Sequence, residues 1–206
     1  MPRSKSSSQW LARHISDPFV KQAQRDGYRS RSAYKLIELN EKDRLIKPGM
    51  RIMDLGSAPG GWSQVAGRLV GAKGRVLATD ILPMSSLAHV DFIQGDFTED
   101  ATVEQLLAWL GGGKFDLIIS DIAPNITGID SADQASSMYF LELALDTVRK
   151  TLKPGANFVA KMFQGAGSDQ YVKELRTSFE KVLIRKPAAS RAQSREVYIV
   201  AKGFKG

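Results

Sequence analysis

The sequence predicts an α/β fold in which helices cover both faces of a seven-stranded, mostly parallel sheet. From residue 50 onward, short apolar runs alternate with segments of helical periodicity, which is the pattern of such a sheet. The chain has 206 residues, of which 43% are hydrophobic, enough for one well-buried core but few for two domains. We therefore expect a flexible basic tail over residues 1–8, which lack an apolar period, and a single domain over residues 9–206.

Each element of this fold is placed by its apolar period and by the residues that start and stop it. Pro18 and Gly27 mark the ends of a short helix, and a second helix is expected from Ser30 or Ser32 to Asn40. The expected strands are Arg51–Leu55, Arg75–Thr79, Asp91–Ile93, Phe115–Ser120, Asn157–Met162, Val182–Arg185 and Val197–Ala201. The expected helices among them are Trp62–Val70, Ala101–Leu110, Ser136–Leu152 and Asp169–Phe179, the third being ended by Lys153-Pro154-Gly155. The last two strands have no helix between them, which allows them to pair antiparallel.

The basic character of the chain suits a polyanionic partner such as nucleic acid. Lys and Arg number 29 against 22 Asp and Glu, a net charge of +7, and the pI is about 9.6. A merely soluble basic surface explains the total equally well, so the clustering is more informative. The basic residues gather in Arg3–Arg13, Lys21–Arg31 and Arg185–Arg195. If the partner is RNA, phosphate contacts are expected from Arg29, Arg31, Arg185, Arg191 and Arg195.

Several classes of function are disfavoured by what the sequence lacks. It contains no cysteine, hence no disulfide, thiolate metal site or cysteine nucleophile, and its two histidines, His14 and His89, are too few for a metal cage. No apolar run approaches the roughly 20 residues that span a bilayer, and the first residues lack the apolar stretch of a secretory signal. We expect a soluble, cytoplasmic protein that binds neither a metal nor a membrane.

The segment Asp54–Trp62 has the features of a ligand-binding turn between a strand and a helix. Its glycines let the backbone approach a ligand closely, and the helix start presents free N–H groups to a polar or anionic group. The spacing departs from the GxGxxG pattern of dinucleotide sites, and Pro59 lacks an N–H donor. A dinucleotide cofactor is therefore disfavoured, although it is not excluded.

Aspartates follow successive predicted strands, at the edge where open α/β sheets bind their ligands. Asp80 can accept hydrogen bonds from a ribose diol and Asp96 from the exocyclic amine of adenine, so adenosine alone would satisfy both. Taken singly, each is more often a helix cap or a turn residue. Because the carboxyl ends of parallel strands meet at one edge, Gly60, Asp80, Asp96 and Asp121 are expected to converge in one crevice.

Lys161 lies within an otherwise apolar strand, where an ammonium group needs either a partner or a route to water. The side chain either extends to the sheet edge or pairs with Asp121, which follows the preceding strand. Glu196, at the start of the last strand, can complete a charged cluster with them. The cluster would lie beside the acidic crevice.

Seven segments, spread over nearly the whole chain, carry a resemblance to a known family: SSSQWL, SRSAYKL, DLGSAPGGWSQ, ILPM, QGDF, DIAPN and SREVYIVA. They resemble segments of the FtsJ (RrmJ) type ribosomal RNA methyltransferases. The resemblance implies a Rossmann-like, class I S-adenosylmethionine-dependent methyltransferase fold and 2′-O-methylation of a uridine in large-subunit (23S) ribosomal RNA. It implies a catalytic set of Lys35, Asp121, Lys161 and Glu196. It also implies cofactor contacts at Gly60, Trp62, Asp80, Asp96 and Asp121.

The residue types suit methyl transfer to a ribose hydroxyl. Transfer from a sulfonium is an in-line displacement that requires the acceptor oxygen behind the methyl group, but neither a metal nor a leaving-group acid. Lys161 can withdraw the hydroxyl proton as a general base if its amine is neutral; burial and Lys35 favour the neutral form, whereas Asp121 and Glu196 oppose it. The implied partner is large-subunit ribosomal RNA, expected within the assembled 50S subunit with naked RNA left open, and a monomeric enzyme is expected.

Three other interpretations stay open at this point. A nicotinamide-dependent dehydrogenase shares the open sheet and Asp80 but would use a GxGxxG turn and has no use for Lys161. A non-catalytic RNA-binding protein on a degenerate methyltransferase fold is disfavoured by the presence of all four charged positions. A base-modifying methyltransferase is also compatible with the fold, although such enzymes commonly use a cysteine, which this chain lacks.

Overall fold

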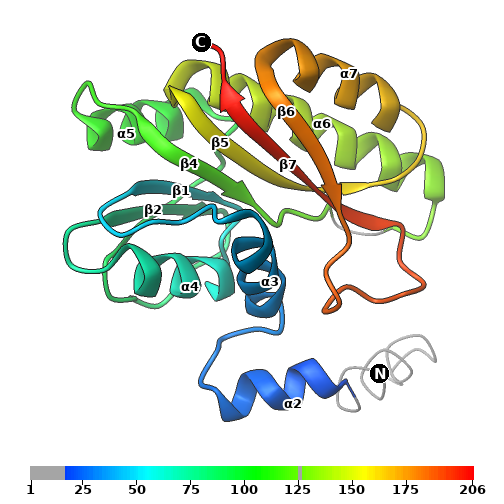
Figure 1. Ribbon diagram of the computed structural model, residues 1–206, viewed down its shortest axis with the longest axis horizontal. Helices are drawn as coiled ribbons and strands as arrows, with labels where there is room; N and C mark the ends of the chain where they lie inside the picture. The colour runs from blue at the N-terminus through cyan, green and yellow to red at the C-terminus, as the bar shows by residue number, and fades with distance from the viewer. Residues whose placement is uncertain (1–16, 125–126) are drawn as a thin grey trace.

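The computed structural model describes residues 17–124 and 127–206, so the expected tail over residues 1–8 and the basic cluster Arg3–Arg13 lie outside the described residues. Within these ranges, seven strands form one sheet in the order β3-β2-β1-β4-β5-β7-β6 (Figure 1). Strands β1 to β5 pair in parallel, whereas β7 pairs antiparallel with both β5 and β6. The predicted mostly parallel sheet is confirmed. The strands are β1 (Arg51–Leu55), β2 (Arg75–Asp80), β3 (Val90–Gln94), β4 (Phe115–Ser120), β5 (Leu152–Phe163), β6 (Phe179–Arg185) and β7 (Glu196–Phe204).

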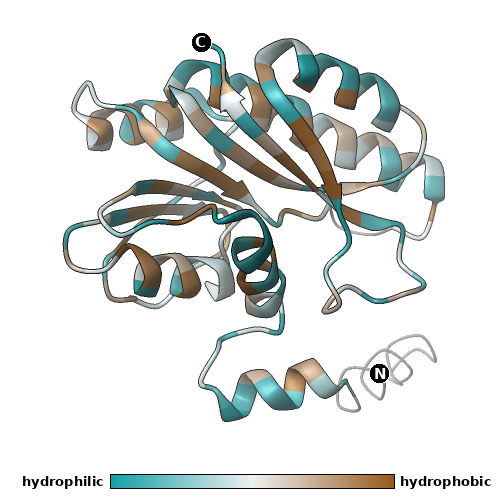
Figure 2. Cartoon of the chain, in the orientation of Figure 1, coloured by the Kyte–Doolittle hydropathy of each residue, from teal (hydrophilic) through white to brown (hydrophobic). Residues whose placement is uncertain are grey.

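Helices cover both faces of the sheet, each by an apolar side that buries its residues against the strands. On one face, α3 and α4 build a core with Leu36, Trp62 and Val65. On the other face, α5, α6 and α7 build a second core that includes Leu106 and Leu145. Figure 2 shows the strands largely in the hydrophobic colour, as expected for a sheet that is buried on both sides. The helices are α2 (Pro18–Arg25), α3 (Ala33–Asp43), α4 (Gly61–Val70), α5 (Asp100–Leu110), α6 (Asp130–Thr151) and α7 (Ser168–Ser178).

Two helix-to-strand junctions differ from the sequence prediction. Leu152 and Phe179, which were expected to end helices, are instead the first residues of β5 and β6. At both points the chain passes from helix to strand without an intervening turn, so a buried apolar residue satisfies either pattern. The expected stop Lys153-Pro154-Gly155 lies inside β5, where the pairing with β4 shifts register. An irregularity of this kind accommodates a proline that cannot donate to the ladder.

Helix α6 begins six residues earlier than the predicted Ser136, at Asp130. The Asp133 carboxylate in its first turn accepts hydrogen bonds from the backbone N–H groups of Thr127 (2.8 Å) and Gly128 (3.1 Å), which fixes the approach of the chain to the helix. These hydrogen bonds hold the pKa of Asp133 below its usual range. At the N-terminal end of the described chain, α2 starts as predicted, with Asp17 accepting from Phe19 N and Pro18 in the first turn.

The parallel pairing places the carboxyl ends of β1 to β5 at one edge of the sheet, the edge at which open α/β sheets bind ligands; this edge is called the ligand edge below. Strands β2 and β3 are added on one side of β1, whereas β4 and β5 are added on its other side. The order of the strands therefore reverses between β1 and β4, and in open α/β sheets ligands bind at such a point. Because β7 runs antiparallel to β5, its first residues lie at that same edge, with Glu196 opposite Phe163 and Tyr198 opposite Lys161. The start of the last strand is thereby brought to the end of the fifth.

Helix α2 lies apart from the two helical layers, at the bottom of Figure 1. The Phe19 ring packs on Tyr34 of α3 at a centroid distance of 5.7 Å, and the Tyr34 hydroxyl donates to Asp26 at 2.6 Å. Arg31 forms an ion pair with Asp17. Among the described residues, no helix is both long and apolar enough to cross a membrane.

Candidate functional site

The loop between β1 and α4 is held against the end of β2 by main-chain hydrogen bonds. The N–H groups of Gly56 and Ser57 donate to Thr79 O at 2.9 and 3.1 Å, and Gly60 N donates to Ser57 O at 2.7 Å. Gly60 has φ of +105°, a conformation that residues with a Cβ rarely adopt. The loop therefore turns sharply into α4, whose first N–H groups have no intrahelical carbonyl and face the ligand edge.

Asp80 and Asp96 lie at neighbouring strand ends, as predicted, and both also perform the ordinary duties of turn residues. Asp80 accepts from Ala58 N at 2.8 Å and from Leu82 N at 2.9 Å, so its carboxylate joins the loop after β1 to the loop after β2. Asp96 accepts from Thr98 N at 2.9 Å. Gly95 N donates to Asp80 O at 2.9 Å, which brings the two segments together. Each carboxylate oxygen still has a free lone pair for a ligand.

Two polar side chains beneath the loop are buried without complete hydrogen bonding. Asp54, at 1% exposure, accepts from Ser63 Oγ at 2.6 Å through Oδ2, while its Oδ1 has no partner among the described residues. The hydroxyl of Ser57 has none either within that part of the chain. Burial, with smaller contributions from the Asp121 and Asp80 charges, raises the pKa of Asp54 from 3.8 to about 7 against the lowering effect of Ser63. A buried polar atom without a hydrogen-bond partner costs about 1–3 kcal/mol. The two side chains beneath the loop therefore suit a ligand that brings hydrogen-bond donors.

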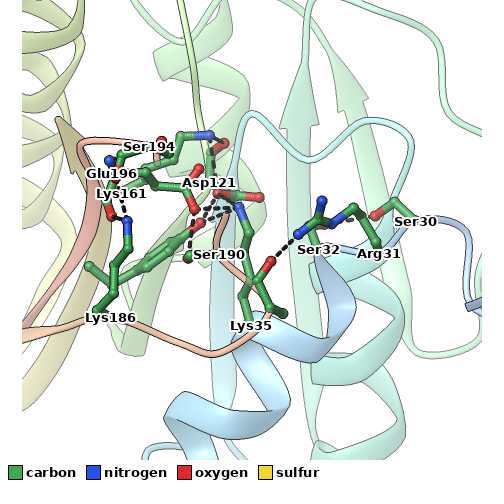
Figure 3. A network of polar contacts seen from close by, with 12 residues as sticks. Ser30, Arg31, Ser32, Lys35, Asp121, Lys161, Lys186, Ser190, Ser194 and Glu196 are labelled. Atoms are coloured by element: carbon green, nitrogen blue, oxygen red, sulfur yellow. Dashed lines mark hydrogen bonds and ion pairs between the residues drawn. The ribbon is translucent and has the colours of Figure 1, made fainter. Parts of the chain in front are cut away.

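Four charged side chains, from α3, the loop after β4, β5 and β7, meet at one place, as Figure 3 shows. Lys161 Nζ lies 2.6 Å from the main-chain oxygen of Asp121 and 3.1 Å from its Oδ1. Lys35 Nζ lies 2.7 Å from Glu196 Oε1 and 3.9 Å from Asp121 Oδ1. The structure thus brings together the four residues that sequence analysis grouped, and it pairs each lysine with a carboxylate.

The strand pattern explains why these side chains share one face of the sheet. Val159, two residues before Lys161 in β5, belongs to the core on the α3 and α4 side, so Lys161 faces the same side. Lys35 reaches the site from α3, which covers that face, and is only 8% exposed although it lies off the apolar stripe of the helix. The aliphatic part of the Lys35 side chain packs among apolar neighbours, which places the ammonium group at the carboxyl edge of the sheet.

Tyr198 lies at the centre of the charged cluster, and sequence analysis missed it. Its hydroxyl donates to Asp121 Oδ1 at 2.6 Å and accepts from Lys35 Nζ at 2.8 Å. Burial raises its pKa well above 10, and the charges of Asp121 and Glu196 raise it further, so the hydroxyl keeps its proton. A signal was present in the sequence, because Tyr198 follows Glu196 by two positions on a strand and therefore points to the same face.

Glu196 is held in its ionised form by the lysines. Burial acts to raise its pKa, but the Lys35 ammonium, the Lys161 charge and a 2.8 Å hydrogen bond from Ser190 Oγ outweigh burial and keep the pKa below the usual 4.5. The pair with Lys35 is largely shielded from water, since both side chains are at most 13% exposed. A pair in this environment is screened less by salt than a surface pair.

Trp62, which the resemblance implied as a cofactor contact, has its indole in the core rather than at the edge. The side chain is 2% exposed, its Nε1 donates to Ser32 O at 2.9 Å, and its ring lies 5.6 Å from that of Tyr198. Its backbone N–H, in the first turn of α4, is the part of the residue that faces the loop. Any contact with a cofactor is therefore a main-chain contact.

Most of the arginines expected to contact phosphate are engaged within the protein. Arg185 binds both oxygens of Asp43 at 2.9 Å, and this hydrogen bonding lowers the pKa of that carboxyl and raises the pKa of Arg185. We therefore correct the expectation for Arg185, which neutralises a carboxylate that is 4% exposed. Arg31 pairs with Asp17 and donates to Ala189 O, and Arg195 lies 3.2 Å from Asp130. Among the described residues, no cluster of three or more potential metal ligands is present.

Comparison with known proteins agrees with this architecture. The model of the family described as FtsJ-like methyltransferase matches residues 28–204. Two proteins named ribosomal RNA large subunit methyltransferase E are similar over the full chain: that of Stutzerimonas stutzeri is 70% identical with all of both chains covered, and that of Marinobacter nauticus is 64% identical with 100% and 99% covered. A crystal structure described as that of a ribosomal RNA methyltransferase from Plasmodium falciparum superposes with a TM-score of 0.79 at 31% identity, covering 87% of this chain and all of that one. The chain therefore belongs to the FtsJ-like methyltransferase family, whose members are enzymes that use S-adenosylmethionine as the methyl donor.

Proposed function

We propose that this enzyme transfers the methyl group of S-adenosylmethionine to the 2′-hydroxyl of a uridine in large-subunit ribosomal RNA. The proposal is supported most directly by the environment of Lys161, whose Nζ has two acceptors on Asp121 at 2.6 and 3.1 Å. The names of the relatives support ribosomal RNA as the substrate, and the basic excess of the chain suits a polyanion. The charged cluster is proposed to activate the ribose hydroxyl.

The methyl donor, S-adenosylmethionine, is proposed to occupy the edge formed by the loop after β1 and the ends of β2, β3 and β4. Asp80 would accept from the ribose hydroxyls and Asp96 from the adenine amine, while Gly60 and the backbone N–H of Trp62 would line the loop. Asp121 would lie where the donor meets the acceptor. The unpartnered Oδ1 of Asp54 fits a ligand with a nearby cationic amine. When bound, S-adenosylmethionine supplies an electrophilic methyl group on a sulfonium.

Lys161 is proposed as the general base. To act as the base, the Lys161 ammonium must first give up one proton to water. The resulting amine has two N–H donors and one lone pair, and the two acceptors on Asp121 match the two donors. The lone pair then points away from Asp121, toward the position of the substrate hydroxyl, and can take its proton as the oxygen attacks. A hydrogen bond from the substrate hydroxyl to Lys161 would also hold the ribose oxygen within near-attack distance of the methyl group, which lowers the barrier to transfer.

Lys35, Glu196 and Tyr198 are proposed to position this base and to balance its charge. The Lys35 ammonium pairs with Glu196 at 2.7 Å and donates to the Tyr198 hydroxyl oxygen at 2.8 Å, while that hydroxyl donates to Asp121. The network fixes the Asp121 carboxylate, and Asp121 in turn orients Lys161. After the methyl transfer, Lys161 would release the accepted proton to water at the carboxyl edge of the sheet.

The natural substrate is proposed to be the assembled 50S subunit, and the enzyme is proposed to act as a cytoplasmic monomer with a single domain. To test the reaction, radiolabelled S-adenosylmethionine is supplied with 50S subunits or with protein-free ribosomal RNA. The methyl group is then located by nuclease and alkali resistance. Label on the 2′-oxygen supports the proposal, and a substrate with 2′-deoxyuridine at the target should accept none; label on a base would refute the ribose assignment and favour a base-modifying enzyme.

The role of Lys161 is tested by Lys161→Ala, with Lys153→Ala as the matched control at the other end of the same strand. Lys153 is exposed and pairs with Asp116 at 3.4 Å. It lies at the start of β5, whereas Lys161 lies near the end of that strand, at the carboxyl edge of the sheet. Loss of a general base should lower kcat by about 10²- to 10⁴-fold, with the affinities for donor and RNA unchanged. If Lys161→Ala binds both ligands normally and keeps wild-type turnover, the assignment is wrong.

A further inference from the structure

A short segment ahead of α3 lies across the beginning of α4 and the ligand-binding loop. We call this segment, residues 27–32, the strap. The Gln64 side chain of α4 holds it at two points, donating to Gly27 O at 2.8 Å and accepting from Arg29 N at 3.1 Å. The strap also packs directly on the start of α4, because a Cβ at position 61 would lie 2.2 Å from the Ser30 hydroxyl oxygen and would displace it.

The guanidinium of Arg29 joins the two loops that border the donor edge. Its Nη1 donates to Pro59 O at 3.3 Å and to Ser85 O at 2.8 Å, and its Nη2 donates to Ser86 O at 2.8 Å. Pro59 belongs to the loop after β1, whereas the two serines belong to the connection between β2 and β3. A rigid, planar fork of donors can serve three carbonyls at once, which a single ammonium cannot do in the same geometry.

The same arginine fills the space beside the tightest turn of the loop. A Cβ built on Gly60 would lie 2.9 Å from Arg29 Nη1 and 2.8 Å from Met84 Sδ. The loop is thus held from two sides, by the Asp80 carboxylate at Ala58 N and by Arg29 at Pro59 O. Directly after these two attachments the chain turns at Gly60 into α4, whose first N–H groups would meet the methyl donor.

We propose that Arg29 is a positioning residue for the methyl donor, and that it holds the loop after β1 and the loop after β2 in the shape that binds S-adenosylmethionine. The inference rests on the proposed donor site. It assigns Arg29 a role different from the phosphate contact that its place in a basic cluster suggests. The reason is that its donors are directed at carbonyl oxygens of the protein.

The experiment compares Arg29→Ala, Arg29→Lys and Arg191→Ala with the wild type. Arg191 is an exposed arginine of the loop before β7 and serves as the matched control for loss of one positive charge. Binding of S-adenosylmethionine without RNA is measured by calorimetry. RNA binding without the donor is measured at several salt concentrations, and hydrogen exchange is followed over residues 56–61 and 83–87.

For Arg29→Ala we expect the dissociation constant for S-adenosylmethionine to rise about tenfold or more, as for the loss of hydrogen bonds from a charged group. Exchange of both loops should become faster, while the salt dependence of RNA binding stays that of the wild type. Arg29→Lys should recover part of the donor affinity. Arg191→Ala should leave donor affinity unchanged.

The opposite pattern would overturn the inference. If Arg29→Ala binds the donor as tightly as the wild type and the slope of log affinity for single-stranded RNA against log salt falls by about 0.7, Arg29 is a phosphate contact. Should Arg29→Ala fail to fold, Gln64→Met removes the two hydrogen bonds between Gln64 and the strap and must weaken binding of S-adenosylmethionine in the same direction. Failure of the donor-site assignment looks different, because S-adenosylmethionine would then not protect residues 56–61 even in the wild type.

Discussion

Replacing Asp54 by Asn should remove a pH dependence of stability that originates beneath the loop between β1 and α4. Asp54 is 1% exposed, and burial raises the pKa of its carboxyl from 3.8 to about 7. Ser63 Oγ still has an oxygen to donate to in the variant, because an Asn side chain keeps one acceptor. The substitution therefore removes the ionisation while it preserves the shape and the main hydrogen bond.

The size of the effect follows from the pKa. A rise from 3.8 to about 7 means that ionising Asp54 costs the folded state about 4 kcal/mol relative to the unfolded chain, at about 1.4 kcal/mol per pH unit. The folded-state pKa is the higher one, so the free energy of unfolding decreases as the pH rises from 3.8 to about 7 and levels off above that. Between pH 5 and pH 8, the loss from this group amounts to about 2.5 kcal/mol.

The assay is urea unfolding of the wild type and Asp54→Asn at several pH values, without the donor. The difference in free energy of unfolding between the two proteins should shift by about 2.5 kcal/mol in favour of the variant from pH 5 to pH 8. Asp146→Asn, which removes one carboxylate from an exposed position, controls for the change in net charge. A difference between wild type and Asp54→Asn that is the same at both pH values would refute the reasoning.

Three further predictions concern the charged cluster and the ion pair at the end of α3. Tyr198→Phe should lower kcat by about 10- to 100-fold without changing donor affinity, because hydrogen bonds to Asp121 and Lys35 are lost while the ring stays packed; equal turnover of both proteins in steady-state assays would contradict this. Glu196→Gln should destabilise the protein at pH 7 but much less at pH 3, because a carboxyl whose pKa is lowered by folding adds stability above pH 4.5 that is lost as the pH falls. Thermal unfolding at the two pH values measures this loss of stability. A loss that is the same at both pH values would argue against the ion pair with Lys35. Arg185→Ala should reduce the free energy of unfolding by about 3 kcal/mol, since it leaves a buried carboxylate without its bidentate partner, and denaturation showing less than about 0.5 kcal/mol would mean that the pair contributes little.

The strands and the residues at their shared carboxyl edge could be predicted because they depend on local patterns. Alternating short apolar runs and helical periods place the strands of a parallel sheet, and residues that follow such strands must share its carboxyl edge. Asp80, Asp96 and Asp121 were placed in this way. The ends of the elements were less predictable where helix and strand join directly, as at Leu152 and Phe179, because a buried apolar residue suits both.

The charged cluster was predicted only in part from the residues themselves. Lys161, Asp121 and Glu196 stood out as charges beside apolar strands, whereas Lys35 was added by family resemblance alone. Tyr198 was missed because an aromatic residue in a strand is more often a core residue, and here it is both. Its hydroxyl reaches the cluster only because β7 pairs with β5 in a register that sets Tyr198 opposite Lys161.

The sequence by itself determined the order of the elements, the buried faces and the residue types at the ligand edge, because periodicity and turn residues act over a few positions along the chain. Only the tertiary structure decided what the charged side chains bind. Arg185 and Asp43 are 142 positions apart, and Arg29 reaches carbonyl groups 56 and 57 positions away. The physical reason is that a long cationic side chain can reach many hydrogen-bond acceptors in the folded protein. Which of these acceptors lies close to it depends on how distant segments pack together.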